Sequence, residues 1–292
     1  MEALRNVVRF KDIDSGKASR HAQQHESLGA APYGVWTRIV RAYSRCGLTK
    51  KEDKLIALAG IAKKMTDQLD DEYVAGMWRR SLPWELTWSV DHPDVQIGER
   101  PRRATDYRAP SFSWASIDGP VSPSGIDGTR PLTNVLDVIM EYVTDDNTGL
   151  IKSGSLVLEC QLQKLSLERN SHEKLDKIYT MYINGVQVCQ PDGPEWERIG
   201  PVVTLDEERD VFDPTESKTL YCVPAKILKE EKPMLMMLLL ELVDREEATY
   251  RRIGVASSLK EVEIDKVLNE ADGAESFPAL SYHDGKHCIR LI

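Results

Sequence analysis

The chain has 292 residues, 41% hydrophobic and 29% charged, which is enough to bury the core of one large or two ordinary domains. Lysine and arginine number 38 against 47 acidic residues, and the net charge of −9 disfavours nucleic-acid binding, which depends on neutralising phosphates. The longest apolar run, residues 234–240, is far shorter than the roughly 20 residues that span a bilayer, and no signal-peptide pattern is present, so we expect no membrane partner.

The five cysteines are widely spaced and include no CxxC pair, which argues against a disulfide framework or a zinc knuckle. Free thiols are typical of a reducing compartment, so the sequence predicts a cytoplasmic protein. The cysteines are Cys46, Cys160, Cys189, Cys222 and Cys288.

Residues 1–33 are polar and weakly patterned, and we expect them to form a flexible N-terminal arm. Within them, His21 and His25 have the i, i+4 spacing that places two imidazoles on one helix face for zinc. No third ligand is identifiable, and the HAQQH stretch lacks the glutamate of HExxH. A solvated arm is therefore the better interpretation, and we predict no metal and no other cofactor.

Residues 34–90 predict a helical unit. In the first helix, apolar residues at i, i+3, i+4 and i+7 form one face. The next helix is predicted to begin at Thr49, which has Glu52 three residues later as in a capping box. The first face comprises Trp36, Ile39, Val40 and Tyr43, and the second helix has an apolar seam of Leu55, Leu58, Ala62, Met65 and Leu69.

Two shorter helices are predicted after this pair. Asp70 or Asp71 can cap a third helix over residues 72–80. Pro83 suits the first turn of a fourth helix over residues 83–89, because its missing N–H is not needed there.

Residues 91–133 contain several prolines and few apolar residues, which is typical of an irregular connector. Inside it, the alternating PSFSWASI stretch, residues 110–117, predicts a short strand in which Phe112 and Trp114 face one side.

From residue 134 the hydrophobic period changes to two, which indicates strands. Asn184-Gly185 between two of them is a strong hairpin signal, because both residues tolerate positive φ. A short helix is predicted at 265–271. The predicted strands are 134–144, 155–166, 177–183, 186–190, 219–223, 235–243, 249–256 and 287–291.

Because helices come first and strands follow, the sequence predicts an α+β fold. The helical unit of residues 34–90 would precede a mainly antiparallel β sandwich or barrel-like unit of residues 134–292, with residues 91–133 as the connector.

No spacing selects a catalytic site or a cofactor-binding site. The chain lacks GxSxG, P-loop and GxGxxG motifs, while a Cys–His pair that meets only in space stays open.

His283 and His287 flank an Asp-Gly turn, so we expect a hairpin with exposed histidines. The DDNTG stretch (145–149) resembles the start of a calcium loop but lacks its later acidic ligands, so a turn between strands is preferred. The acidic stretches 205–210 and 243–247 are interpreted as solvated loops.

Four tryptophans lie within 37 residues: Trp78, Trp84, Trp88 and Trp114. Tryptophans most often anchor a core, with the indole N–H bound to an acceptor. They are also enriched at interface hot spots, so these four are the candidate interaction anchors.

Four blocks in fixed order carry a family resemblance: WTRIVRAYS (36–44), EDKLIALAGIA (52–62), YVAGMW (73–78) and YRAPSFSWASIDG (107–119). This order resembles the region that follows the HET domain in fungal heterokaryon-incompatibility proteins. More generic strand blocks follow, and Phe112 stands where the family more usually has tryptophan. The later blocks are LYCVPA (220–225), LLLELVD (238–244) and TYRRIGVA (249–256).

The resemblance implies a role in fungal non-self recognition, in which such proteins trigger growth arrest or programmed cell death. Their HET domain, likened to the TIR fold, normally precedes the first block. This chain starts 35 residues before that block, so we expect the HET effector domain to be absent and carry none of its chemistry over.

The sequence therefore favours a non-enzymatic interaction module whose partners are proteins, either full-length relatives or a HET domain. Two alternatives stay open. One is an enzyme with an unrecognised site in the β-rich half, and the other is a truncated remnant without retained function.

Overall fold

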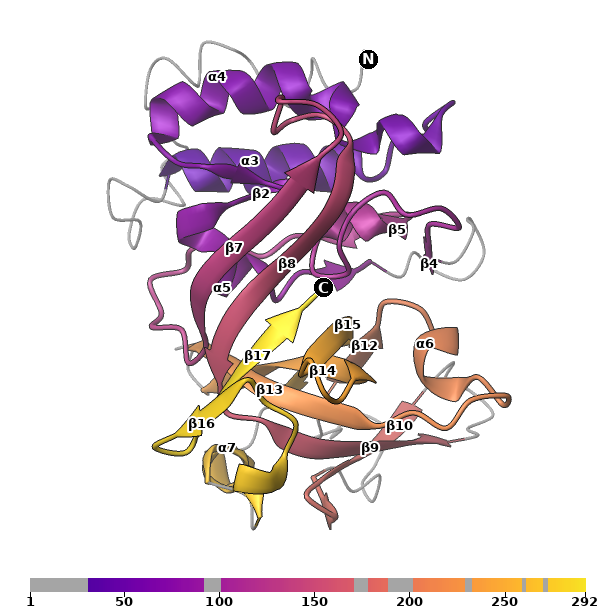
Figure 1. Cartoon of the computed structure of the whole chain (residues 1–292), viewed down its shortest axis with the longest axis vertical. Helices are drawn as coiled ribbons and strands as arrows, with labels where there is room; N and C mark the ends of the chain where they lie inside the picture. Colours follow the sequence, from indigo (N-terminus) through magenta and orange to yellow (C-terminus); the bar gives the residue numbers. More distant parts are fainter. Residues whose placement is uncertain are drawn as a thin grey trace. The chain divides into compact units, whose positions relative to one another are not determined.

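The computed structural model describes residues 31–91, 101–170, 178–188, 202–228, 233–258, 261–269 and 273–292. These residues form an α+β fold, as predicted, with short helices early in the chain and a large sheet after them (Figure 1). The predicted His21–His25 pair and all of the predicted arm except its last three residues lie outside the described ranges.

The chain divides into two compact units. The first contains the residues up to Thr129 together with Ile139–Gly154, and the second contains Arg130–Val138 and Ser155–Ile292. Residues 101–129, expected to be a connector, thus belong to the same unit as the helices.

Helix α3 (Ala31–Tyr43) opens the described chain. All four residues of its predicted face, Trp36, Ile39, Val40 and Tyr43, are buried, so the helical period is confirmed.

The second predicted helix is only partly correct. Its seam residues are buried, but two 3-10 turns, η1 (Lys51–Lys54) and η2 (Ile56–Leu58), precede helix α4 (Ala59–Leu69). The Lys54 carbonyl accepts a hydrogen bond from the Tyr43 hydroxyl at 2.8 Å, while Leu58 N donates to Leu55 O. This exchange replaces the α-helical bond that Leu58 N would make to Lys54 O. The Thr49 capping box is wrong, because no side chain caps η1.

The predicted helix over residues 72–80 is wrong. Strands β1 (Tyr73–Val74) and β2 (Met77–Trp78) form a tight antiparallel hairpin instead. Its two turn residues, Ala75 and Gly76, have φ of 49° and 93°, a left-handed pair that a helix excludes. Turn η3 (Arg79–Ser81) and the short helix α5 (Leu82–Glu85) follow, and Pro83 lies in the first turn of α5 as predicted. The predicted end of this helix at residue 89 is wrong, because α5 ends at Glu85 and residues 89–90 form a strand.

The strand predicted over residues 110–117 is also wrong. Ser113 Oγ accepts from Ala115 N at 3.0 Å and caps the 3-10 turn η4 (Trp114–Ser116). Phe112 and Trp114 are nonetheless buried. Two small ladders flank this turn: β3 (Ser89–Val90) pairs with β6 (Val121–Ser122), and β4 (Arg102–Arg103) pairs with β5 (Ile117–Asp118).

The main sheet has the order β11-β10-β9-β13-β14-β15-β17-β8-β7, with β12 on β15 and β16 on β17. The pairs with a defined register are antiparallel except β15 with β17, which is parallel. The strands are β7 (Asn134–Tyr142), β8 (Ile151–Cys160), β9 (Gln163–Asn170), β10 (Ile178–Ile183), β11 (Val186–Gln187), β12 (Val202–Leu205), β13 (Leu220–Leu228), β14 (Met234–Asp244), β15 (Thr249–Ser258), β16 (Ser281–His283) and β17 (Lys286–Leu291).

The strand predictions hold with local differences. Asn184 and Gly185 have φ of 50° and 79° in the turn between β10 and β11, as predicted. The strand predicted over 155–166 is divided between β8 and β9, because Leu162 N leaves the ladder and donates to His287 Nδ1. Strands β12 and β16 were not predicted.

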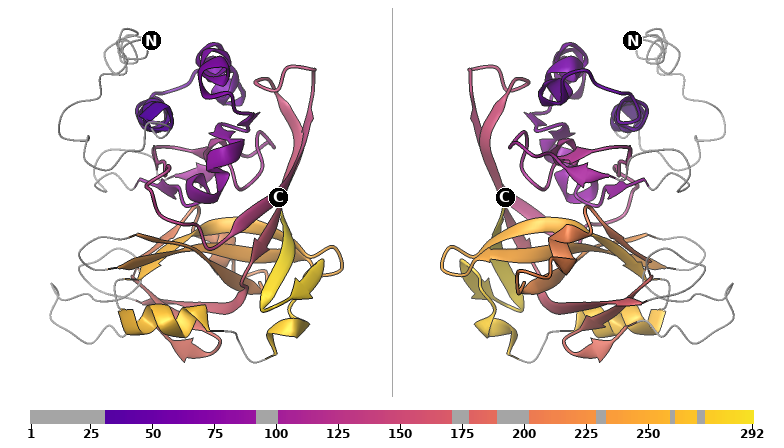
Figure 2. Two further views of the ribbon diagram at one scale, coloured as in Figure 1. Left: turned by 90° about the vertical axis from the view of Figure 1, so that its left-hand side faces the viewer. Right: turned by 90° about the vertical axis from the view of Figure 1, so that its right-hand side faces the viewer.

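The second unit has its core on one face of this sheet. The short helices α6 (Arg209–Phe212) and α7 (Glu261–Leu268) pack there (Figure 2). The predicted helix 265–271 overlaps α7 but begins too late. Buried members of this core include Leu165, Met181, Met237, Ile264 and Val267.

Candidate functional site

The four candidate anchor tryptophans all lie in the first unit. Trp78, Trp88 and Trp114 are at most 2% exposed, whereas Trp84 is partly exposed. Trp84 Nε1 donates to Thr129 O at 2.9 Å and Trp88 Nε1 donates to Phe112 O at 2.7 Å. Three of the four are therefore core residues here, and of the four only Trp84 is partly exposed.

Three of the resemblance blocks meet at one carbonyl oxygen. Trp36 Nε1 donates to Gly76 O at 2.9 Å, and Trp114 Nε1 donates to the same oxygen at 2.8 Å. Tyr43 and Trp78 pack edge-on against these indoles, at centroid distances of 6.3 and 5.5 Å. We call Trp36, Tyr43, Gly76, Trp78 and Trp114 the Gly76 cluster.

Glycine is required at position 76 for two reasons. Its φ of 93° is costly for any residue with a Cβ. A Cβ added there would also lie 2.8 Å from Trp114 Nε1, far inside contact distance. The Gly76 carbonyl can therefore accept hydrogen bonds from both indoles only because residue 76 is glycine.

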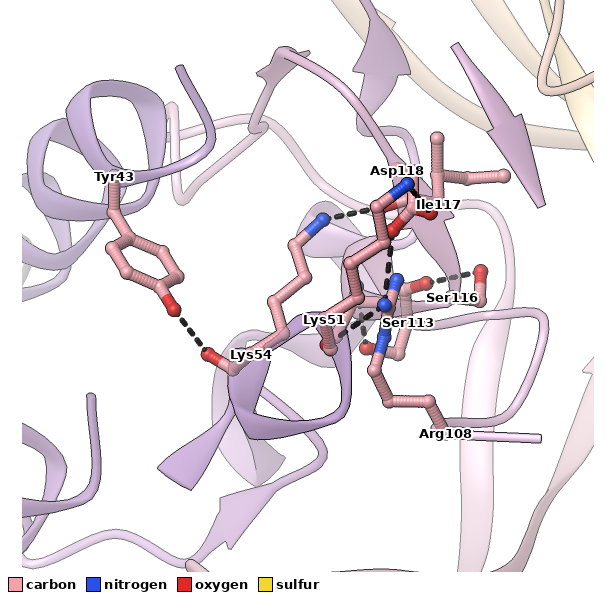
Figure 3. A network of polar contacts seen from close by, with 9 residues as sticks. Tyr43, Lys51, Lys54, Arg108, Ser113, Ser116, Ile117 and Asp118 are labelled. Atoms are coloured by element: carbon pink, nitrogen blue, oxygen red, sulfur yellow. Dashed lines mark hydrogen bonds and ion pairs between the residues drawn. The ribbon is translucent and has the colours of Figure 1, made fainter. Parts of the chain in front are cut away.

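Beside the cluster lies a buried polar network around Lys54 (Figure 3). Lys54 is 4% exposed, its Nζ donates to Ile117 O, and its ammonium group lies 5.3 Å from the Trp114 ring centroid. Burial, and then the nearby Arg108 guanidinium, lower the pKa of Lys54 to about 7.

Arg108 joins three segments of the first unit. Its Nε donates to Ala115 O at 2.7 Å, and its Nη1 donates to Lys51 O and to Asp118 Oδ1, both at 2.9 Å. Lys51 Nζ also pairs with Asp118 at 3.2 Å, so this carboxylate already serves two cations. Hydrogen bonds and charge from Arg108 and Lys51 outweigh burial and lower the pKa of Asp118.

Glu85 is another buried ionisable group of the first unit, at 5% exposure. Its Oε1 lies 2.6 Å from Ser81 Oγ, and its Oε2 accepts from Trp78 N at 3.3 Å. Among the described residues it forms no ion pair. Burial therefore dominates and raises the pKa of Glu85 to about 8, so the side chain is mostly neutral at pH 7.

Neither Lys54 nor Glu85 was singled out from the sequence, although a signal for Lys54 exists. Residues 54, 58, 62, 65 and 69 continue the apolar seam at spacings of 4, 4, 3 and 4, which places Lys54 on the buried side. Arg108 has no comparable signal, because its position depends on contacts with Lys51 and Asp118.

In the second unit, the acidic stretch 205–210 is not a solvated loop. Asp206 and Asp210 are 1% and 5% exposed. Arg252 Nη1 donates to both Asp206 oxygens, at 2.7 and 2.6 Å, in a pair with no exposed side-chain surface. The prediction failed because the partner is 46 residues away in the chain. The stretch 243–247 is exposed, as expected.

The hairpin of β16 and β17 is confirmed, but its histidines differ from the prediction. His283 is exposed, whereas His287 is fully buried. His287 Nδ1 accepts from Leu162 N at 3.2 Å, and Nε2 lies 2.8 Å from Ala274 O, which can only accept. The ring is therefore neutral with its proton on Nε2, and the backbone occupies both nitrogens.

The DDNTG stretch is a turn between β7 and β8, as predicted. Asp146 Oδ1 accepts from Thr148 N at 3.0 Å, and Asp146 Oδ2 pairs with Lys63 at 2.6 Å. Within the described ranges, no group of three histidine, cysteine or acidic residues is placed to hold a metal ion.

Comparison of the chain with protein families, with curated proteins and with solved structures finds no match. No helix in the described part of the chain is both long and apolar enough to cross a membrane.

Proposed function

We propose that this chain is a non-enzymatic interaction module of the fungal heterokaryon-incompatibility type, which acts in the cytoplasm by binding proteins. Its partners would be full-length relatives or a HET domain, and its role would lie in non-self recognition and in the control of cell death.

The observation that carries this proposal is the Gly76 cluster. Three of the four specific blocks of the resemblance, which begin at residues 36, 73 and 107, supply its members. Residues shared with a family because of one packing arrangement should meet in one core, and these do. The blocks thus behave as the signature of a folded unit.

The chemistry of the buried ionisable groups supports a binding role over catalysis. Lys54, Glu85 and His287 are each at most 5% exposed, and main-chain groups or a serine occupy their polar atoms. A catalytic acid or base needs a polar atom within hydrogen-bond reach of its substrate. The four described cysteines are free thiols, which supports the cytoplasmic assignment.

The test is inducible expression of the chain in a filamentous fungus, alone and together with full-length HET-domain proteins. We expect no growth arrest from the chain alone, co-purification with at least one such protein, and a changed arrest response on co-expression. Absence of both binding and effect across the panel would refute the proposal. Growth arrest caused by the chain alone would refute the view that it is not itself an effector.

Two alanine variants make the test specific. Gly76→Ala strains the turn and displaces Trp114, so it should abolish binding. Gly60→Ala is the matched control, because no atom lies within 4 Å of the added Cβ and helix α4 tolerates alanine better than glycine. Binding that survives Gly76→Ala would show that the Gly76 cluster is not needed for the interaction.

A further inference from the structure

Lys54 and Glu85 are two of the ionisable side chains that the first unit buries, and neither forms an ion pair within the described residues. Lys54 is 4% exposed and Glu85 is 5% exposed. Within the described residues, no carboxylate pairs with Lys54 and no cation pairs with Glu85. An unpaired charge is very costly in a protein interior, so each group is more stable there in its neutral form.

The groups that face Lys54 do not remove this cost. Arg108 repels an ammonium group, and Asp118 attracts it but already binds Arg108 and Lys51. The face of Trp114 and the Ile117 carbonyl favour the charged form, but burial outweighs them and the pKa of Lys54 falls to about 7.

Glu85 is in the converse situation. Ser81 and the Trp78 N–H are neutral donors, and the nearby Asp71 carboxylate disfavours a second negative charge. Tyr33 and Tyr73, the other titratable groups that interact with it, carry raised pKa values and stay neutral. In its neutral form Glu85 can donate to Ser81 Oγ, because the Ser81 hydroxyl has a second acceptor, Trp78 O, at 3.2 Å.

Both groups become charged when water reaches them. We propose that the first unit is a pH-dependent conformational device, in which the charging of Lys54 and Glu85 on exposure to water favours opening of the unit at neutral pH. The packing of the Gly76 cluster opposes this opening, since Trp114 lies against Lys54 and Trp78 N binds Glu85. This inference is independent of the proposed function.

The pH range in which the first unit is least stable follows from the pKa shifts of Glu85 and Lys54. Glu85 has a raised pKa, so its contribution to stability is complete below pH 4.5 and is lost as pH rises to about 8. Lys54 has a lowered pKa, so its contribution is complete above pH 10.5 and is lost as pH falls to about 7. Between pH 7 and 8 the unit has therefore lost most of both stabilising contributions.

Tryptophan fluorescence can follow the unfolding of this unit alone. Of the six tryptophans, Trp36, Trp78, Trp84, Trp88 and Trp114 belong to the first unit. The sixth, Trp196, lies outside the described residues and is replaced in a Trp196→Phe background. Urea titrations between pH 5 and 10 then give the folding equilibrium constant of the unit.

Glu85→Gln removes one ionisable group with little change in shape. The ratio of its folding constant to that of the background protein should rise about a hundredfold from pH 5 to pH 7, because each pH unit contributes up to tenfold. Glu52→Gln, at an exposed carboxylate, is the control and should give a ratio that is constant with pH. Because the test uses the change of this ratio with pH, it remains valid if Glu85→Gln is less stable than the background protein at every pH.

Lys54→Met tests the buried lysine, for which the pH dependence has the opposite direction. The ratio of its folding constant to that of the background protein should rise about a hundredfold as pH falls from 10 to 8. The same ratio for Lys50→Met, at an exposed lysine, should stay constant with pH. If Glu85→Gln does not fold, Glu85→Leu must give the same rise between pH 5 and 7. Ratios that stay constant with pH for both buried positions would overturn the proposal.

Discussion

Gly76→Ala should be among the most destabilising single changes in the first unit. The substitution places a Cβ on a residue with φ of 93°, which costs roughly 2 kcal/mol in backbone strain. The added atom would lie 2.8 Å from Trp114 Nε1, and the forced movement of this fully packed ring adds about 1–3 kcal/mol. Because Trp114 and Trp36 share the Gly76 carbonyl as acceptor, the two hydrogen bonds should weaken together.

We therefore expect the free energy of unfolding of the first unit to fall by about 3–5 kcal/mol. Urea titration followed by tryptophan emission in the Trp196→Phe background measures this change. The control is Gly60→Ala, which should raise stability by about 0.5–1 kcal/mol, because no atom opposes the new Cβ in α4. A loss below about 1 kcal/mol for Gly76→Ala would refute the account of the cluster.

Three further predictions concern the buried pair, the thiols and the hairpin turn. Asp206→Leu should lower the free energy of unfolding by about 3–5 kcal/mol, because it removes the carboxylate that binds the fully buried Arg252 guanidinium. Adding Arg252→Met should restore most of this loss in thermal unfolding, and an equal loss in the double variant would contradict the prediction. Iodoacetamide followed by mass spectrometry should label the partly exposed Cys46 well before Cys222, because burial raises the pKa of the Cys222 thiol to about 12; the reverse order contradicts it. Gly185→Val should lower the free energy of unfolding by about 1–2 kcal/mol, because Gly185 has a φ of 79° in the turn after β10. An unchanged melting temperature would contradict the turn assignment.

The sequence predicted those elements whose pattern is local. The face of α3, the seam that ends at Leu69 and the Asn184-Gly185 turn were all correct, because one segment buries its own periodic residues or sets its own φ angles. The α+β class followed from the change of period near residue 134. These signals need no knowledge of distant residues.

The failures have a common cause in distant partners. Residues 72–80 contain helix-compatible residues, but the left-handed turn at Gly76 is held by indoles from Trp36 and Trp114. The local sequence indicates an exposed loop position for Asp206, because it does not show that Arg252 pairs with this residue. In each case a tertiary contact overrides the local preference, and the contact joins residues 38 to 46 positions apart.

The candidate site was predicted only in outline. Of the four tryptophans predicted as candidate interaction anchors, three are buried in the first unit and only Trp84 is partly exposed. Lys54 and Glu85 were missed because a charged residue type normally indicates an exposed position. Their role depends on what surrounds them, which one sequence does not give.

The division of the chain between its two units affects how it can be cut or exchanged. Ile139–Gly154, which belongs to the first unit, is inserted between two parts of the second, Arg130–Val138 and Ser155–Ile292. No single break in the chain therefore separates the units, and a fragment that ends at Thr129 lacks the β7–β8 turn whose Asp146 binds Lys63 on α4. During synthesis the first unit cannot be completed until the chain has reached Gly154, by which time the second has begun. An exchange of the first unit alone would need, besides a crossover after Thr129, two further crossovers at the two ends of Ile139–Gly154.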